Sequence, residues 1–260
     1  MVETSQVILQ SKNISVSFNG FKAIRNLDFQ VVKNRVHFLI GPNGAGKTTL
    51  LDIICGKTPL SEGKVIFKNN YNLSKMKEYQ IVRKGIGRKF QAPSIFSNLT
   101  VYENLLISMK QKKNLLATLK AVVTKDQETK ILDMLKLIGL TAQQNQKAGV
   151  LAHGQKQWLE IAMVLLQEPE LVLLDEPIAG MSKVERTKTG ELIRQIAKER
   201  AVLIVEHDMD FVREFADVVT VMHGGQLLCE GSMEDVQNDP RVREVYLGKK
   251  EDKHVKTRAN

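Results

Sequence analysis

Residues 36–50 read VHFLIGPNGAGKTTL and contain three kinds of local structure in succession. Residues 36–40 are an almost wholly apolar run, which predicts a strand buried on both faces of a parallel sheet. A glycine-rich turn follows, and residues 48–55 have helical character until Gly56 ends them. A buried strand, a glycine-rich turn and a helix in this order predict an α/β fold with a phosphate-binding loop.

The turn fits the P-loop pattern G-x-x-x-x-G-K-[ST] from Gly41 to Thr48. Glycines let the backbone curl so that successive N–H groups face phosphate oxygens at the positive end of the helix. We expect Lys47 to bridge the β- and γ-phosphates of a nucleotide, and the Thr48 hydroxyl to ligate Mg²⁺. A chance glycine-rich turn is the alternative, which the full motif between a strand and a helix argues against. The expected nucleotide contacts are Gly41, Pro42, Asn43, Gly44, Ala45, Gly46, Lys47, Thr48 and Thr49.

Residues 171–177, LVLLDEP, supply an acidic pair directly after a second apolar run. Asp175 emerges at the carboxyl end of this predicted strand, where α/β sheets bind ligands and where it can hold Mg²⁺ through water. Glu176 is placed to polarise an attacking water. The acidic pair could instead cap the next element, an interpretation weakened by the P-loop. His207 follows a third apolar run, residues 201–205, and could reach a γ-phosphate, although a lone histidine is more often structural.

The remaining chain divides into a strand-rich start and a helical middle. Residues 7–18 are rich in β-forming residues, Asn19-Gly20 is a turn signal, and residues 21–36 hold two more short apolar stretches. Leucines and lysines recur at helical spacing over residues 102–157, which predicts a helical insertion. Further predicted elements are a strand at 64–68, a helix face made by Trp158, Ile161, Ala162, Leu165 and Leu166, a helix at 184–200, and a hairpin turn at 223–226.

Residues 151–157, LAHGQKQ, resemble the signature motif of ATP-binding cassette (ABC) ATPases and lie shortly before the acidic strand, as in that family. The resemblance implies an α/β P-loop NTPase with a RecA-like parallel sheet core, an N-terminal antiparallel β subdomain and an inserted helical subdomain. The implied ABC ATPase domain spans residues 7–248. Within it we expect the β subdomain at about 7–35 and 63–72 and the helical subdomain at about 92–160, with a flexible, basic tail at 249–260.

The same resemblance implies roles at matching positions. Glu176, His207 and Gln91 would act in catalysis, while Thr48, Gln91 and Asp175 would contact the metal. Phe18 matches the aromatic side chain that stacks on adenine, with a core phenylalanine as the alternative. In this family the signature acts in trans across a head-to-tail dimer, where it would place Ala152, His153, Gly154 and Gln155 at the γ-phosphate. Residues 179–182 occupy the segment that crosses the dimer interface.

Two positions depart from the commonest signature, which has Ser and Gly where this chain has Ala152 and His153. Without the serine hydroxyl at position 152, the signature loses one hydrogen bond to the charged γ-phosphate, which would cost about 1.5–3 kcal/mol. We therefore expect the signature to hold the phosphate more through backbone N–H groups and Gln155. The pattern L-A-x-G-Q is similar to the branch of importers for branched-chain amino acids, amides and urea. Residues 85–91 and 153–160 look most like the urea importer's ATPase.

The resemblance therefore implies an ATPase subunit that binds ATP and Mg²⁺, dimerises with an identical or paralogous subunit, and powers uptake of a small polar solute. Urea is the favoured solute, followed by amides or branched-chain amino acids. The implied partners are transmembrane permease subunits and, indirectly, a solute-binding protein. We expect a cytoplasmic protein, peripheral on the inner face of the plasma membrane. Residues 92–96 offer apolar anchors for a permease helix, unless Ile95 and Phe96 belong to the protein's own core.

Composition agrees with these expectations without deciding among them. The 260 residues include 38 Lys+Arg and 29 Asp+Glu, a formal charge of +9. Two cysteines exclude a disulfide scaffold, no apolar run approaches the ~18–20 residues of a bilayer span, and no secretory signal is expected. Residues 71–90 and 241–260 account for the whole excess charge. A solvated basic surface beneath an anionic leaflet suffices to explain it, so nucleic acid is not an expected partner.

Three other functions remain as alternatives. A nucleic-acid-associated ABC ATPase of the repair or translation type usually carries two cassettes, long coiled coils or zinc inserts, and the sequence shows none of them. An exporter-type ABC ATPase would share the same nucleotide motifs. A regulatory subunit with a degenerate site is the third, and intact Lys47, Asp175, Glu176 and His207 argue against it.

Overall fold

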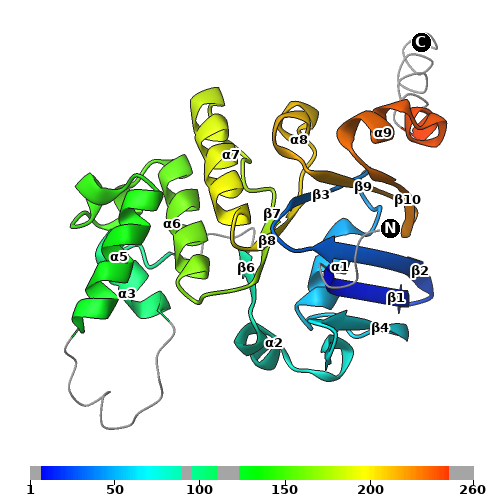
Figure 1. Ribbon diagram of the computed structural model, residues 1–260, viewed down its shortest axis with the longest axis horizontal. Helices are drawn as coiled ribbons and strands as arrows, with labels where there is room; N and C mark the ends of the chain where they lie inside the picture. Colours follow the sequence, from blue (N-terminus) through cyan, green and yellow to red (C-terminus); the bar gives the residue numbers. More distant parts are fainter. Residues whose placement is uncertain (1–6, 90–94, 110–122, 246–260) are drawn as a thin grey trace, which may run out of the picture.

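The computed structural model describes residues 7–89, 95–109 and 123–245, which form two sheets covered by helices (Figure 1). The strands are β1 (Val7–Phe18), β2 (Phe21–Val32), β3 (Val36–Ile40), β4 (Glu62–Phe67), β5 (Tyr71–Asn72), β6 (Ile86–Lys89), β7 (Leu171–Asp175), β8 (Ala201–Val205), β9 (Val218–His223) and β10 (Gln226–Gly231). The α-helices are α1 (Lys47–Ile54), α2 (Glu78–Lys84), α3 (Val101–Ser108), α5 (Lys125–Leu137), α6 (His153–Leu165), α7 (Lys183–Ala197), α8 (Met209–Phe215) and α9 (Met233–Asn238). Gln91 and residues 92–94 of the predicted docking segment lie outside the described residues.

The central sheet has six strands in the order β10-β9-β3-β8-β7-β6. Five of them run parallel, which confirms the predicted α/β core. The edge strand β10 runs antiparallel to β9, a departure from an all-parallel sheet. The reason is the predicted hairpin turn, in which Gly224 and Gly225 both have positive φ, of 56° and 80°. A two-residue turn of this kind can return the chain only as an antiparallel neighbour.

The central strands are buried on both faces, as their apolar runs predict. Alternate residues enter different cores because side chains alternate across a strand. On β3, for example, Phe38 joins a core with helices α6, α7 and α8, while Leu39 joins a core with α1 and the second sheet. The P-loop helix α1 and the helices α6 to α8 thus cover opposite faces of one sheet.

The second sheet is antiparallel, with strand order β2-β1-β4-β5. The predicted turn at Asn19-Gly20 joins β1 to β2, and both residues have positive φ, of 47° and 85°. Residues 21–32 form one long strand instead of two short ones, since β-bulges absorb the irregular apolar spacing while the pairing with β1 continues. This sheet and α1 share one core, and contacts between β2 and α1 place the sheet beside the P-loop.

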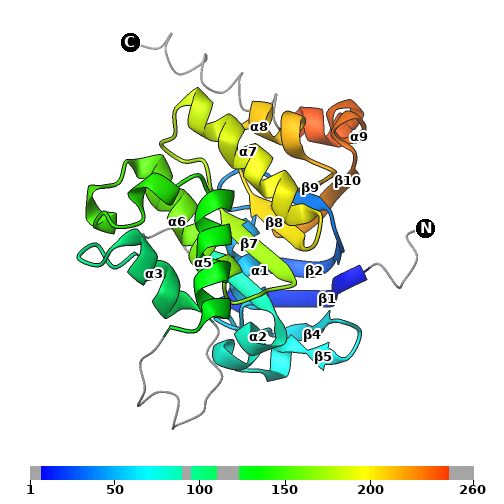
Figure 2. The same ribbon diagram turned by 60° about the vertical axis from the view of Figure 1, so that its left-hand side comes forward.

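Helices α3, α5 and α6 gather on one side of the molecule, where Figure 2 shows them together. The middle of the chain is thus helical where the structure describes it, as the spacing of its leucines and lysines predicts. The predicted face of α6, from Trp158 to Leu166, is buried at all five positions. Among the described helices, none is both long and apolar enough to cross a membrane.

Strand β6 was not expected from its sequence, because Ile86–Lys89 contains a glycine and two basic residues and has no apolar run. It forms through tertiary contacts. Its backbone pairs in parallel with β7, and a Cβ at Gly87 would lie 2.7 Å from the Val164 side chain, so a small residue is needed beneath α6. Its two basic side chains, Arg88 and Lys89, are both buried in the protein.

Candidate functional site

The P-loop lies between β3 and α1, where the sequence places it, and its glycines are sterically required. Gly41 has φ +149°, and a Cβ there would lie 2.1 Å from the carbonyl oxygen of Met222. Gly46 has φ +100°, and a Cβ would meet Ala23 O at 2.8 Å. The loop is therefore held between β9 and β2, and its curled backbone faces solvent at Asn43 and Gly44.

Lys47 reaches back over the loop that precedes it. Its Nζ lies 2.8 Å from Gly41 O and 3.0 Å from Pro42 O, and donates to both. Partial burial lowers the pKa of Lys47, whereas the nearby carboxylates of Glu176 and Asp175 act in the opposite direction. The structure thus brings the P-loop lysine and the acidic pair to the same place, although 128 residues separate Lys47 from Asp175 in the chain.

Asp175, Glu176 and His207 meet at the carboxyl ends of β7 and β8. Asp175 is 2% exposed, and burial raises its pKa while the Arg88 guanidinium lowers it. Glu176 has a positive φ of 46°, an uncommon conformation for this residue, and its N–H donates to Val205 O at 2.9 Å. His207 Nδ1 lies 3.6 Å from Glu176 Oε1. Left-handed conformations of non-glycine residues cluster at functional sites, and this one lies directly after β7.

The acidic end of β7 also contacts a residue that sequence reasoning placed elsewhere. Arg88 and Lys89 were counted with a solvated basic surface, and this is wrong for both. The Arg88 side chain is 6% exposed and lies between Asp52 and Asp175. The Lys89 side chain is buried 3.4 Å from Glu160 of α6. Adjacent side chains of β6 point to opposite faces of the sheet, and both faces are covered: Arg88 meets Asp52 of α1 and Lys89 meets Glu160 of α6. No local sequence pattern signals this burial.

The signature segment begins α6, and Gln155 supports it locally. Gln155 Oε1 accepts a hydrogen bond from Ala152 N–H at 3.0 Å, so this oxygen is engaged within the turn. A Cβ at Gly154 would lie 2.4 Å from Glu185 Oε1, so the Glu185 side chain of α7 closely approaches the start of α6. His153 Nε2 lies 3.0 Å from Ala179 O and so joins the signature to residues 179–182. The sequence predicts His153 as a signature residue at the γ-phosphate of a second subunit and as a departure from the commonest signature, but gives no indication of this contact within the chain.

Ala152 occupies the N-cap of α6 with φ −60° and ψ 157°, the conformation of a capping residue, but provides no side-chain oxygen. We predict that Ala152→Ser completes a capping box with Gln155, as Ser182 does with Glu185 in α7. The free energy of unfolding should rise by about 1 kcal/mol, which corresponds to an increase of about 2–4 °C in the Tm measured by calorimetry. Ala152→Val is the control, because valine caps as poorly as alanine. A Tm for the serine variant equal to that of the valine variant would contradict the prediction.

A cavity of about 490 Å³ connects the signature with the acidic pair. It is lined by Lys89, His153, Gln157, Asp175, Glu176, Ala179 and Gly180. The side-chain oxygen of Gln157 is buried there without a hydrogen-bond partner among the residues that the structure describes. The predicted catalytic glutamate and one predicted signature residue therefore border one polar space within a single chain.

The residues around Asp175 fit a magnesium ion that arrives with a nucleotide. Asp175 Oδ1 is buried, and no described residue hydrogen-bonds to it, which leaves one carboxylate oxygen for a cation or its water. Within residues 7–89, 95–109 and 123–245, no cluster of three or more His, Cys, Asp or Glu side chains could hold a metal. Mg²⁺ suits such a site because it usually takes one or two carboxylates together with substrate phosphates.

The side chain that is predicted to stack on adenine, Phe18, lies on the surface of the protein. Phe18 ends β1 and is 48% exposed, opposite Phe21 across the hairpin. It is therefore not a core phenylalanine, and stacking on adenine stays a prediction.

Ile95 packs against the core with α3 and α6, whereas Phe96 is exposed and its N–H donates to Asn104 Oδ1 at 2.8 Å. Of the predicted anchors, Ile95 thus belongs to the protein's own core and Phe96 does not.

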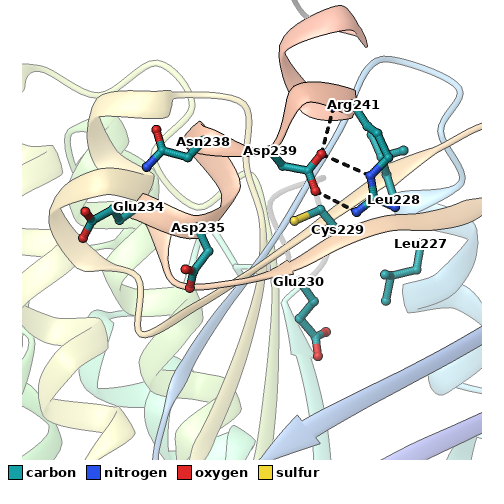
Figure 3. Close-up of a pocket in the computed structure, with 9 residues that line it drawn as sticks. All are labelled: Leu227, Leu228, Cys229, Glu230, Glu234, Asp235, Asn238, Asp239 and Arg241. Carbon is teal, nitrogen blue, oxygen red and sulfur yellow. Dashed lines mark hydrogen bonds and ion pairs between the residues drawn. The ribbon is translucent and has the colours of Figure 1, made fainter.

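A larger open cavity, of about 760 Å³, lies at the other edge of the central sheet, between β10 and α9 (Figure 3). Asp239 and Arg241 form an ion pair of 2.7 Å on its wall, beside Cys229. None of the predicted site residues lines it. Volume alone therefore does not identify the nucleotide site, which is marked by the P-loop and the acidic strand.

Comparison with known proteins gives a consistent result. The family model described as "ABC transporter" matches residues 24–179, and that described as "Branched-chain amino acid ATP-binding cassette transporter" matches residues 226–252. The chain is similar to the probable branched-chain amino acid transport ATP-binding protein LivG of Archaeoglobus fulgidus, with 36% identity over 93% of this chain and 95% of that protein. It is 34% identical to the high-affinity LivG protein of Escherichia coli K12, over 94% of this chain and 99% of that one.

Solved structures agree. A nucleotide-free ATP-binding cassette from an ABC transporter is 32% identical, with a TM-score of 0.79 over 92% of this chain and 98% of that one. The ADP conformation of an ATP-binding cassette of an ABC transporter is 33% identical, with a TM-score of 0.80 over 93% of this chain and 99% of that one.

Proposed function

The chain belongs to the ABC transporter family of ATPases, and from this premise we propose that it is the ATP-hydrolysing subunit of an importer. Two permease subunits would form the pathway, and a solute-binding protein would deliver the solute. The observation that carries the proposal is the meeting of Lys47, Asp175, Glu176 and His207 at one end of the central sheet. It is supported by similarity over 94% of the chain to a protein described as a branched-chain amino acid transport ATP-binding protein. This favours a transporter over the nucleic-acid-associated and degenerate alternatives.

We propose branched-chain amino acids as the principal solute class. Support comes from the relatives named above, which are described as branched-chain amino acid transport proteins, and from the C-terminal match over residues 226–252. Urea is a second candidate, supported only by residues 85–91 and 153–160. The solute would not contact this subunit, so the uptake of each solute distinguishes the two candidates.

Nucleotide binding would use the P-loop backbone and the start of α1. Residues 41–49 would surround the phosphates, and Lys47 would exchange its contacts with Gly41 O and Pro42 O for oxygens of the β- and γ-phosphates. Thr48 on α1 and Asp175 on β7 would hold Mg²⁺, together with Gln91 outside the described residues. When bound, the ion supplies positive charge to the phosphate oxygens.

Hydrolysis would depend on Glu176. Its left-handed backbone and the bond from its N–H to Val205 O fix where the carboxylate emerges, and about 40% of the side chain is exposed toward an incoming water. Glu176 would accept a proton from that water, and His207 would contact the γ-phosphate. Such positioning and electrostatic stabilisation carry most of the catalysis of phosphoryl transfer.

The signature would complete a second subunit's site in a head-to-tail dimer. Ala152 and His153 are exposed, and the start of α6 offers backbone N–H groups and a positive dipole to a γ-phosphate. The bond from His153 to Ala179 O would move the signature and residues 179–182 as one unit. Closure around ATP and reopening after hydrolysis would then drive the permease.

A permease helix would dock near Phe96. Ser97 O accepts from Gly149 N–H at 3.0 Å, so the exposed side chains of Phe96 and Val150 flank one backbone contact. Two exposed apolar side chains beside the segment that follows Gln91 support the predicted docking surface. Attachment there would hold the protein on the inner face of the membrane as a peripheral subunit.

Phe18→Ala is expected to weaken ATP binding by about 1–3 kcal/mol, the range for stacking of a base on an aromatic side chain. Phe21→Ala is a matched control, because Phe21 pairs with Phe18 on the hairpin and is also exposed. Titration calorimetry with a non-hydrolysable ATP analogue measures both. Equal losses in the two variants would show that the effect belongs to the hairpin and not to adenine stacking.

The importer proposal is tested by uptake. In cells whose gene for this chain is deleted, uptake of labelled leucine and valine should fall, and the parent chain but not Glu176→Gln should restore it. Loss of urea uptake with amino-acid uptake unchanged would instead select the second candidate. Unchanged uptake of both solutes, with salt-sensitive co-purification of DNA or RNA, would overturn the transporter proposal.

A further inference from the structure

Arg88 connects two elements that each carry one proposed magnesium contact. Its Nη1 lies 2.5 Å from Asp52 Oδ1 on α1, and its Nη2 lies 3.4 Å from Asp175 Oδ2 at the end of β7. The Arg88 guanidinium also donates a hydrogen bond to Sγ of Cys55, which follows α1. One nearly buried guanidinium therefore joins the P-loop helix to the acidic strand by a rigid, planar fork.

The sheet does not provide this connection directly. Helix α1 follows β3, and β8 lies between β3 and β7. Thr48 and Asp52 are four residues apart on α1, so they lie on the same face, one turn from each other. A link that holds Asp52 relative to Asp175 thus also sets the separation of the Thr48 hydroxyl from the Asp175 carboxylate.

Arg88 also determines which oxygen of Asp175 is available. Oδ2 faces the guanidinium, whereas no described residue hydrogen-bonds to Oδ1. Burying a carboxylate without a charged partner costs free energy, so the guanidinium stabilises Asp175. Because the carboxylate is planar, a contact that holds Oδ2 also fixes the direction in which Oδ1 points. The arrangement presents a single oriented oxygen to the space beside the P-loop.

We propose that Arg88 is a positioning residue for magnesium: through Asp52 and Asp175 it sets the spacing and orientation of the Thr48 and Asp175 oxygens that receive the ion of Mg·ATP. The inference rests on the proposed nucleotide site and adds a residue outside its motifs. Arg88 does not touch the nucleotide or the ion. Partners of this kind typically change metal affinity by about 10–100-fold when they are removed.

The test separates metal binding from nucleotide binding. Affinity for a fluorescent non-hydrolysable ATP analogue is measured with Mg²⁺ and with EDTA, and Mn²⁺ binding to the protein–analogue complex is followed by EPR. For Arg88→Gln we expect the Mn²⁺ affinity and the Mg²⁺-dependent gain in nucleotide affinity to fall about tenfold or more, while affinity in EDTA stays within about twofold. Arg88→Lys, which keeps the charge without the fork, should fall between Arg88→Gln and the parent.

Two further variants keep the test decisive. Asp52→Asn removes one arm of the link from a partly exposed position, and it should lower Mn²⁺ affinity in the same direction even if Arg88→Gln does not fold. Arg213→Gln, which breaks an exposed pair of 3.0 Å with Asp210, should leave Mn²⁺ affinity unchanged.

Equal losses of affinity with Mg²⁺ and with EDTA in Arg88→Gln and Asp52→Asn would reduce the link to a structural role and overturn the inference. Unchanged Mn²⁺ affinity in both variants would overturn it as well. If the parent protein bound the analogue neither with Mg²⁺ nor with EDTA, the proposed nucleotide site would itself be wrong. If the parent bound the analogue without any gain from Mg²⁺, only the proposed magnesium contacts, and with them this inference, would be overturned.

Discussion

Glu176→Gln is expected to lower kcat for ATP hydrolysis by about two to four orders of magnitude while ATP still binds. Glutamine keeps the size and hydrogen-bonding shape of glutamate but cannot accept the proton of the attacking water. The backbone of residue 176 is fixed by its bond to Val205 O, so the amide should occupy the same position as the carboxylate. Phosphate release measures the rate, and light scattering in ATP should detect a trapped dimer.

Glu191→Gln is the control for this prediction, because Glu191 is exposed on α7 and lies outside the proposed site. It should hydrolyse ATP at the parental rate. If Glu176→Gln also turned over ATP at the parental rate, Glu176 would not be the base. A variant that neither bound ATP nor hydrolysed it would likewise contradict the assignment, since the substitution should spare binding.

Lys47→Ala should weaken ATP binding by about 2–4 kcal/mol, or roughly 30- to 1,000-fold in Kd. The ammonium group already lies over the P-loop, within hydrogen-bonding distance of Gly41 O and Pro42 O, so it is placed where phosphates would enter. Its removal deletes charge-assisted contacts to the most highly charged part of the nucleotide. Titration calorimetry with an ATP analogue measures the loss.

Lys183→Ala serves as the matched control, since Lys183 is an exposed lysine at the start of α7. Its ATP affinity should equal that of the parent. An affinity of Lys47→Ala within about threefold of the parent would show that the loop binds phosphates through its backbone alone. Both variants should melt near the parental Tm, because neither side chain contributes to the cores.

The predicted core strands at 36–40, 171–174 and 201–205 were confirmed because strands buried on both faces leave continuous apolar runs. The hairpin turns were confirmed because Asn-Gly and Gly-Gly adopt positive φ readily. Strand β6 was missed because pairing with β7 and the space beneath α6 stabilise it, not its own residues. The basic surface was overestimated for the same reason, since the burial of Arg88 and Lys89 depends on that pairing.

The roles assigned to Phe18, Gln91 and the signature stay predictions, because each concerns a group that one chain does not supply. Phe18 is exposed, Gln91 lies outside the described residues, and Gln155 Oε1 bonds to its own turn. Adenine, the metal and a second subunit would complete these contacts.

By itself, the sequence determined the P-loop, the acidic strand and the α/β class, because each is encoded by a short run whose residue types suit one local geometry. The signature was found through its resemblance to that of ABC ATPases. Only the tertiary structure decided the strand order, the contact of His153 with Ala179 and the link from Asp52 through Arg88 to Asp175. These features join distant segments: Asp52 and Asp175 are 123 residues apart, and the paired residues His37 of β3 and Val218 of β9 are 181 apart. Packing of the whole chain brings such segments together, and no local pattern specifies which side chain will meet which.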